Sequence, residues 1–347
     1  MKRKLMAWTM TLCMCAGLAG GTGAVSVWAA EDNTSAEDTQ SDAVQETGEE
    51  SGEETADPDA VRVGALKGPT AMGMAQRLDA DVYDFTIAAS PDEIVPMVVQ
   101  GNLDIAAVPA NLAATLYQKT EKDVSVLAVN TLGVLYIVEN GDSVKSVEDL
   151  KGKTIYASGK GATPEYALDS VLEASGIDPE KDVTIEYKSE HAEVVSALAQ
   201  DQTAVGLLPQ PFVTTALMKN DKLKVALDLN ELWEASMNDD SRLVTGVVIA
   251  KNEFIKDHAD QVDAFMDAYK ESVDFVNSHR EAAAQIIGDH DIIPKEVAQK
   301  AIPDCSIVFI EGDDMKTMLS GYLTTLNDQN PQIIGGQLPD DGFYYKR

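Results

Sequence analysis

The sequence is poor in cysteine, histidine, basic side chains and aromatic side chains. Its 347 residues include 3 cysteines and 4 histidines, and Phe, Trp and Tyr together make up 6%. Cys13 and Cys15 fall in the leading apolar segment, which leaves Cys305 as the cysteine of the remaining chain. An internal disulfide is therefore excluded there. Cys305 lies in an apolar run, and we expect a small buried side chain.

The shortage of bases gives the chain a formal charge of −31, from 27 Lys and Arg against 58 Asp and Glu. Removing the twelve acids of residues 31–60 and the three bases of residues 2–4 leaves −22 for residues 61–347. Such acidity argues against nucleic acid or an anionic membrane surface as a partner. It does not exclude an anionic ligand, because local dipoles set the potential of a pocket.

Motifs for catalysis and for metal binding are missing as well. His191, His258, His279 and His290 lie in polar helical or turn contexts, with no His or Cys at metal-ligand spacing. The segment Gly159-Lys160-Gly161 lacks the spacing of a nucleotide-binding loop, and no Gly-x-Ser-x-Gly motif occurs. The sequence therefore predicts no metal, no cofactor and no catalytic residue.

The first sixty residues have the composition of a leader and a tether. Met1–Lys4 is basic, Leu5–Ala24 is apolar, and a cleavage site precedes Ala30, so residues 1–29 are predicted to be a secretory signal peptide. Lipid attachment at Cys15 is the alternative, although Met14 stands where Gly or Ala is usual. Residues 30–60 are predicted to be an acidic disordered tether. Either fate places the protein outside the cytoplasm, secreted or on the cell surface, and in the periplasm if the source has an outer membrane.

From Val61 onward, short apolar strands alternate with helical segments, which predicts an α/β fold with predominantly parallel sheets. Two such series predict two lobes joined by a two-strand hinge. We assign residues 61–138 plus 247–347 to the first lobe and residues 139–246 to the second. The expected crossings lie near Val138–Asp142 and near Thr245–Lys251.

A long helix is predicted after the return strand. Its apolar residues recur at helical spacing and mark one buried face: Val262, Phe265, Met266, Tyr269, Val273 and Val276. Trp233 also has helical spacing, and it is either a core residue, the reading we favour, or a stacking partner for a planar ligand.

Ligands of such folds bind outside the carboxyl ends of the strands, where helices begin. The glycine-rich loop Ser158–Gly161 and the helix start Thr163-Pro164-Glu165 offer uncovered N–H groups at a positive helix end. A polar or anionic solute can bind there, or the same residues simply cap the helix. The predicted ligand-binding residues are Lys67, Gly68, Thr70, Ser90, Asn111, Asn130, Thr131, Ser158, Gly159, Lys160, Gly161, Thr163 and Gln210.

Three stretches resemble the type II solute-binding proteins of ABC importers, in the branch that serves nitrate, sulfonate, taurine and thiamine-precursor uptake. They are SVEDLKGKTIYASGKG with the following TPEYALDSVLEASGID, then AVGLLPQPFVTTAL, and RVGALKGPTAMGM together with LDIAAVPANLA. In the thiamine-precursor relatives the first strand end carries a longer polar motif than Leu66–Met72 does here.

The resemblance implies a two-lobed periplasmic-binding-protein fold of type II. It implies an extracytoplasmic, monomeric subunit that captures a small anionic, zwitterionic or aromatic solute and delivers it to a membrane permease with its ATPase. An enzyme of cofactor biosynthesis with the same fold, or a surface sensor without a transport role, is the alternative.

Overall fold

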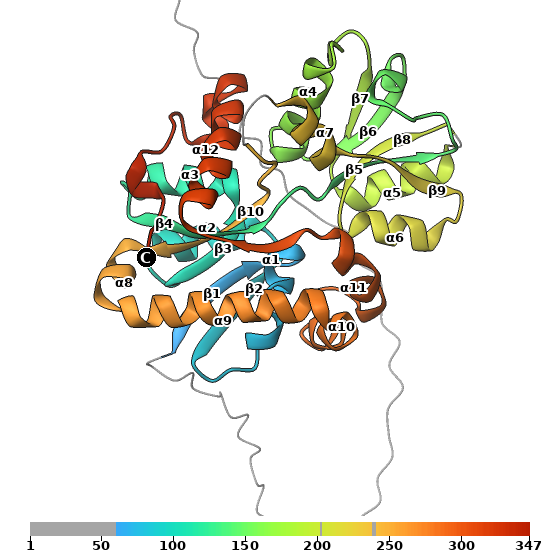
Figure 1. The fold of residues 1–347 in the computed structure, drawn as a ribbon. Coiled ribbons are helices and arrows are strands. Elements are labelled where there is room, and N and C mark those ends of the chain that lie inside the picture. The colour runs from blue at the N-terminus through green and yellow to red at the C-terminus, as the bar shows by residue number, and fades with distance from the viewer. Residues whose placement is uncertain (1–59, 202, 238–240) are drawn as a thin grey trace, which may run out of the picture. The chain divides into compact units, whose positions relative to one another are not determined.

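The computed structural model describes residues 60–201, 203–237 and 241–347. The predicted signal peptide and nearly all of the predicted tether therefore lie outside the described residues. The described chain contains two β-sheets, each flanked by helices, as expected for an α/β protein (Figure 1).

The first sheet has the order β11-β4-β10-β3-β1-β2. Strands β1, β2 and β3 run parallel, whereas β10 runs antiparallel to both β3 and β4, and β11 runs antiparallel to β4. β4 is buried along its whole length, as is usual for a strand covered on both faces. The strands are β1 (Val61–Leu66), β2 (Tyr83–Ala88), β3 (Ile105–Pro109), β4 (Val124–Thr131), β10 (Gly246–Lys251) and β11 (Ile307–Ile310).

The second sheet has the order β7-β6-β8-β5-β9, with β6, β7 and β8 parallel and β5 antiparallel to β8 and β9. Its order repeats that of the first sheet, because β2-β1-β3-β10-β4 and β7-β6-β8-β5-β9 each place three parallel strands beside an antiparallel one. The strands are β5 (Leu135–Asn140), β6 (Thr154–Ser158), β7 (Thr184–Lys188), β8 (Val205–Pro209) and β9 (Leu223–Asp228).

We call the first sheet with its helices the first lobe, and residues 135–236 the second lobe. The chain leaves the first lobe between β4 and β5, so the first crossing lies at residues 132–134, earlier than the predicted Val138–Asp142. Residues 135–138 pair with β8 and β9 and belong to the second lobe. Both strands are apolar, and the short break at Gly133 between them gives little sequence signal for a change of sheet. The chain returns at β10, near the predicted Thr245–Lys251.

The helices connect and cover the strands. They are α1 (Pro69–Met72), α2 (Pro91–Val99), α3 (Ala110–Lys119), α4 (Thr163–Ala174), α5 (His191–Gln200), α6 (Phe212–Lys219), α7 (Leu229–Ser236), α8 (Asn252–Asp257), α9 (Ala259–Ser278), α10 (Arg280–Asp289), α11 (Lys295–Ala301) and α12 (Gly312–Gln329). Short 3₁₀ turns lie at η1 (Ala75–Arg77), η2 (Val147–Leu150), η3 (Ile302–Asp304), η4 (Pro331–Ile334) and η5 (Asp341–Phe343). The predicted apolar face of α9 is confirmed, because all six of its residues are buried.

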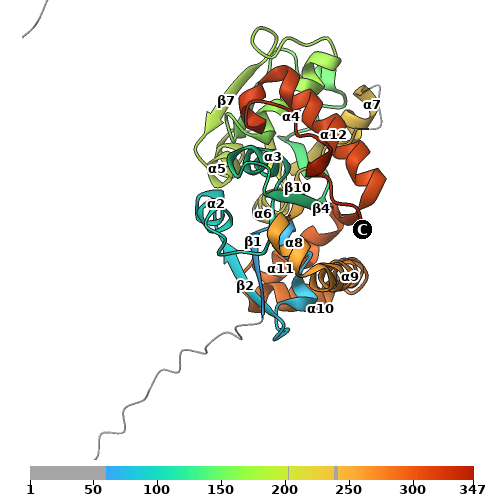
Figure 2. The ribbon, with the colours of Figure 1, turned by 90° about the vertical axis from the view of Figure 1, so that its left-hand side faces the viewer.

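One hydrophobic core extends across both lobes. It includes Val108 of β3, Leu168 of α4 and Tyr322 of α12. Trp233 of α7 is fully buried against Tyr322, with ring centroids 5.6 Å apart. The core reading of Trp233 is thus confirmed, and α12 of the first lobe lies along α4 of the second (Figure 2).

The C-terminal residues complete the first lobe. The ring of Phe343 is fully buried, and the N–H of Tyr345 donates to the carbonyl of Val126 at 2.9 Å. The expected burial of Cys305 is confirmed as well. Among the residues that the structure describes, no helix has the length and apolar character needed to span a membrane.

Candidate functional site

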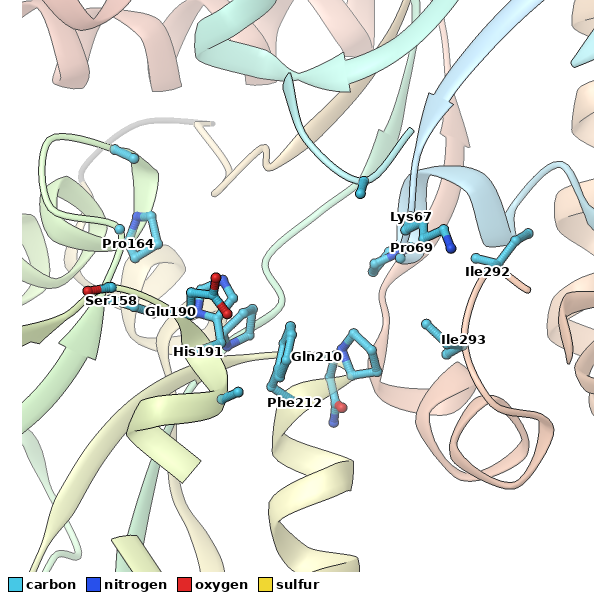
Figure 3. Close-up of a pocket in the computed structure, with 18 residues that line it drawn as sticks. Lys67, Pro69, Ser158, Pro164, Glu190, His191, Gln210, Phe212, Ile292 and Ile293 are labelled. Atoms are coloured by element: carbon cyan, nitrogen blue, oxygen red, sulfur yellow. Dashed lines mark hydrogen bonds between the residues drawn. The ribbon is translucent and has the colours of Figure 1, made fainter. Parts of the chain in front are cut away.

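A cavity of about 750 Å³ lies between the two lobes (Figure 3). It collects the carboxyl ends of parallel strands from both sheets. The first lobe contributes Lys67–Pro69 after β1 and Ala89 after β2, and the second lobe contributes loops after β6, β7 and β8. A smaller cavity of about 350 Å³ adjoins it and reaches the end of β3 at Pro109.

Six helices begin at these two cavities, namely α1 to α3 in the first lobe and α4 to α6 in the second. Helix N-termini expose N–H groups and carry partial positive charge. Ala162 and Glu190, at the N-caps of α4 and α5, make no side-chain cap hydrogen bond. Pro164 has no N–H, and the N–H groups of Glu165 and Glu193 donate to the carbonyls of Ala162 and Glu190 at 3.1 Å. The first N–H of each helix, at Thr163 and His191, therefore remains for an oxygen of a bound solute.

Seven of the predicted binding residues line the cavities. The larger cavity is lined by Lys67, Gly68, Ser158, Gly159 and Gln210, and the smaller one by Asn111 and Thr163. The Thr163 hydroxyl lies 3.4 Å from Oδ1 of Asn111, which links the two lobes across the cleft.

The glycine-rich loop has the backbone that its sequence requires. Gly159 and Gly161 have φ of 78° and 76°, in the left-handed region that favours glycine. A Cβ on Gly159 would lie 3.0 Å from Cγ of Pro164, so the loop packs closely on the start of α4. The loop thus brings its backbone to the cavity wall without a covering side chain.

Gln210 lines the larger cavity, but its side-chain carbonyl oxygen is hydrogen-bonded within the protein. Oε1 accepts hydrogen bonds from the backbone N–H of Thr214 at 3.2 Å and from the Thr214 hydroxyl at 2.9 Å. These bonds give a partner to the Thr214 N–H in the first turn of α6, which has no carbonyl acceptor inside the helix. The acceptor end of this amide is therefore occupied by the helix rather than offered to a solute.

The other predicted residues do not line either cavity. The Thr70 hydroxyl donates to the carbonyl of Leu66 at the end of β1, and the Ser90 hydroxyl donates to the Glu93 carboxylate of α2. Asn130 and Thr131 are buried, and the Thr131 hydroxyl donates to Oδ1 of Asn130 at 3.1 Å.

Two residues of the glycine-rich loop also lie outside both linings. The Lys160 ammonium lies 5.5 Å from the centre of the Tyr187 ring, and Gly161 donates its N–H to Glu165. Ser158 and Gly159 of the loop thus line the larger cavity, whereas its lysine contacts another surface, and ligand binding by the loop stays a prediction.

His191 lines both cavities, and the sequence reasoning placed it in a polar context without a role. It opens α5, directly after the carboxyl end of β7. The same strand-end rule that selected the other loops would have found it. Its Nδ1 is hydrogen-bonded to the hydroxyl of Ser158, and its ring lies 4.8 Å, centroid to centroid, from the ring of Phe212. Burial lowers the pKa of His191, which favours the neutral imidazole.

Charge on the cavity wall is sparse and divided between the lobes. Among the described lining residues, Lys67 of the first lobe and Glu190 of the second carry formal charges. Figure 3 shows Glu190, His191 and Ser158 on one side of the cavity and Lys67, Ile292 and Ile293 on the other. The isoleucines precede α11, and no pattern in the sequence distinguished them. Besides these charges, the wall carries the polar residues Ser158, Ser189, His191 and Gln210 and is otherwise made of Gly, Pro, Ala, Ile and Phe.

Metal binding finds no support in the described part of the chain, where no group of three or more His, Cys, Asp or Glu side chains is placed to hold an ion. The described lining of the larger cavity offers backbone N–H donors, two serine hydroxyls, an amide, an imidazole, one ammonium group and one carboxylate.

The chain belongs to the NMT1/THI5-like family, whose model matches residues 81–283. No significant relative was found among curated proteins.

Solved structures share the fold. An ABC transporter protein from Parabacteroides distasonis is 23% identical with a TM-score of 0.71, over 83% of this chain and 99% of that one. The periplasmic aliphatic sulphonate binding protein SsuA from Escherichia coli is 16% identical with a TM-score of 0.66, over 84% and 93%. The desulfurization enzyme DSZB is 13% identical with a TM-score of 0.57, over 78% and 92%. The expected two-lobed periplasmic-binding-protein fold is thereby confirmed.

Proposed function

We propose that this protein is the extracytoplasmic solute-binding subunit of an ABC importer. The observation that carries the proposal is the cavity between the lobes, at which six helices begin. Such an arrangement surrounds a small solute with N–H donors from two separate bodies of the chain. It binds without requiring a catalytic group.

The comparisons support this role at the level of family and fold. Several structural neighbours are described as ABC transporter proteins or as sulfonate-binding proteins. A solute-binding subunit of this kind hands its ligand to a permease and its ATPase, which we propose as the partners of a monomeric protein. The predicted signal peptide and acidic tether agree with an extracytoplasmic location.

Closure of the two lobes would distinguish the protein with a bound solute from the empty protein. The two crossing segments contact each other, because Thr245 donates its hydroxyl to the carbonyl of Leu132 at 2.6 Å and its N–H to Thr131 at 3.0 Å. On one side of the cleft α12 packs against α4, so motion that opens the cleft has to take place mainly away from this contact.

The ligand that this wall fits is a small solute with an oxygen-rich end and an apolar body. Lys67 and the uncovered N–H groups of α4 and α5 favour an anionic or zwitterionic end, and Glu190 accepts an ammonium group of a zwitterion. Phe212 and the prolines favour an apolar or flat body.

A binding screen tests the proposal. Purified residues 60–347 are tested by differential scanning fluorimetry and calorimetry with alkyl and aryl sulfonates, amino acids, aromatic acids and nitrate. A solute at 100 times its Kd stabilises the protein by about 2.7 kcal/mol. Native mass spectrometry of the protein as isolated detects a solute that co-purifies.

A matched pair of variants locates the site. Phe212 of α6 lines the cavity, whereas Met218 of the same helix is 44% exposed and lies outside it. Phe212→Ala should lower the affinity for the stabilising compound, and Met218→Ala should leave it unchanged. Equal affinity of both variants, or stabilisation by no compound and no co-purified solute, contradicts the proposal.

A hydrolase is the second candidate, favoured by the hydrogen bond between Ser158 and His191. A hydroxyl next to a neutral imidazole is the pairing of an activated nucleophile and its base. Conversion of a bound compound to product by the wild-type protein, lost in Ser158→Ala, would establish this function instead of simple binding.

A further inference from the structure

The hydrogen bond between Ser158 and His191 fixes the proton of the imidazole. Ser158 is 2% exposed at the end of β6, and Nδ1 of His191 is the acceptor within reach of its hydroxyl among the described residues. A buried hydroxyl that donates to no acceptor lowers the stability of the protein by about 1–3 kcal/mol. The Ser158 hydroxyl therefore donates to Nδ1.

An imidazole whose Nδ1 accepts a hydrogen bond carries its single proton on Nε2 when it is neutral. Burial of the ring keeps it neutral by lowering its pKa. Nε2 makes no hydrogen bond within the described residues. It is also not enclosed by the atoms of these residues, so a bound molecule can reach it. Since the ring lines both cavities, its Nε2–H is a donor available to a bound molecule.

The surroundings of this donor select the molecule. The ring of Phe212 lies beside that of His191 at an interplanar angle of 47°, and Pro164 and Pro209 line both cavities as well. These surfaces are apolar and rigid, and they suit the face of a flat ring rather than a flexible chain.

We propose that His191 determines ligand specificity, held by Ser158 as the Nε2–H tautomer so that it donates to an oxygen or ring nitrogen of a solute whose flat body packs on Phe212. This inference rests on the proposed binding function and makes it specific. The solute must present a hydrogen-bond acceptor next to an aromatic or otherwise planar group. A solute that presents only an ammonium group would meet a donor at Nε2 and find a partner only in Glu190, so it should bind more weakly.

Nuclear magnetic resonance of the ligand-free protein tests the tautomer independently of any ligand. Residues 60–347 labelled with ¹⁵N in histidine give two-bond ring correlations that distinguish Nε2–H from Nδ1–H. The His191 signals, assigned by their loss in His191→Gln, should show the Nε2–H pattern near pH 7.5. In Ser158→Ala the pattern should become a mixture, while the pattern of His258, which lies between α8 and α9 and lines neither cavity, stays unchanged. An Nδ1–H pattern in the wild-type protein overturns the inference without affecting the proposed function.

Binding of flat probes tests the specificity. Benzoate and benzenesulfonate are titrated against cyclohexanecarboxylate and benzylamine up to 10 mM. The readout is the His191 Nε2 signal in the wild-type protein, together with calorimetry in the wild-type protein and in the variants that lack this imidazole. The two flat acceptors should shift this signal and bind more tightly than the other two compounds. His191→Gln retains an N–H donor near the position of Nε2 and should keep the preference, whereas His191→Leu should lose roughly fivefold to tenfold in affinity for the flat acceptors.

Failure of both flat acceptors to shift the Nε2 signal overturns the specificity assignment. So does equal binding by the His191→Leu and wild-type proteins. The proposed function fails separately, if the broader screen yields no bound solute at all.

Discussion

Asp169 on α4 is predicted to destabilise the protein at neutral pH. Its carboxylate is half-buried, and burial together with Glu165, Glu173 and Glu180 raises its pKa to about 6. Glu165 and Glu173 stand four residues before and after it on the same helix face, where like charges repel. Replacing Asp169 by Asn removes the charge and keeps the size and helix propensity of the side chain.

The magnitude follows from the pKa. A rise from 3.8 to about 6 corresponds to about 3 kcal/mol for a fully enclosed group, at 1.36 kcal/mol per pKa unit. Asp169 is partly exposed, so solvent screening reduces this value, and we expect Asp169→Asn to stabilise the fold by about 1 kcal/mol at pH 7.5. The folded state binds the proton more tightly than the unfolded state does. The wild-type protein therefore loses stability as pH rises from about 4 to 6, and the advantage of the variant disappears at pH 4.

Urea denaturation of both proteins at pH 4, 5, 6 and 7.5 measures this difference. Asp221→Asn, at an exposed turn position of the same lobe, is the control and should change stability little at any pH. A variant whose advantage is the same at pH 4 and pH 7.5, or absent at pH 7.5, would refute the reasoning.

Three further outcomes are expected. A Cβ on Gly246 would lie 2.5 Å from Oδ1 of buried Asn130, so Gly246→Ala should lower the free energy of unfolding by about 1–3 kcal/mol in urea; an unchanged midpoint contradicts this packing. Phe343→Ala should cost about 3–5 kcal/mol, because the ring is fully buried, and a loss below 1 kcal/mol would show that the C-terminal residues do not pack as described. Because burial lowers the pKa of His191, the unfolded chain takes up its proton first, so wild-type stability should fall as pH drops below about 6.5. His191→Gln should be less sensitive to pH between 7 and 5, and identical pH profiles would contradict the assigned burial.

Local patterns were sufficient to predict the alternation of strands and helices from Val61 onward, the long helix α9 and the Gly-rich loop. The first strand, β1, begins at Val61, where this alternation was predicted to start, because a buried strand before a turn has a clear sequence signal. α8, α11 and β11 were not predicted, since each is short and its residues are set by contacts with distant elements. The change of sheet between β4 and β5 was placed late for a related reason, because pairing partners are not visible in a single apolar run.

The candidate site, too, could be predicted from the sequence only in part. Loops that follow strands could be located, and Ser158 and Gly159 do lie on the cavity wall. Side-chain direction could not be predicted: Lys160 lies over Tyr187, and the Gln210 carbonyl turns to α6. Ile292 and Ile293 reach the cavity from the C-terminal part of the first lobe, a proximity that only the tertiary fold creates.

The position of β10 between β3 and β4 has a consequence for the order of folding. The first sheet stays divided until residues beyond 245 have been synthesised and paired, whereas all strands of the second sheet come from the continuous segment 135–228. Joining β4 to β10 closes a loop of more than a hundred residues, which is slow for an unstructured chain and faster once that loop has become compact. We therefore expect the second lobe to fold first. Its folding would then bring β4 and β10 of the first sheet together.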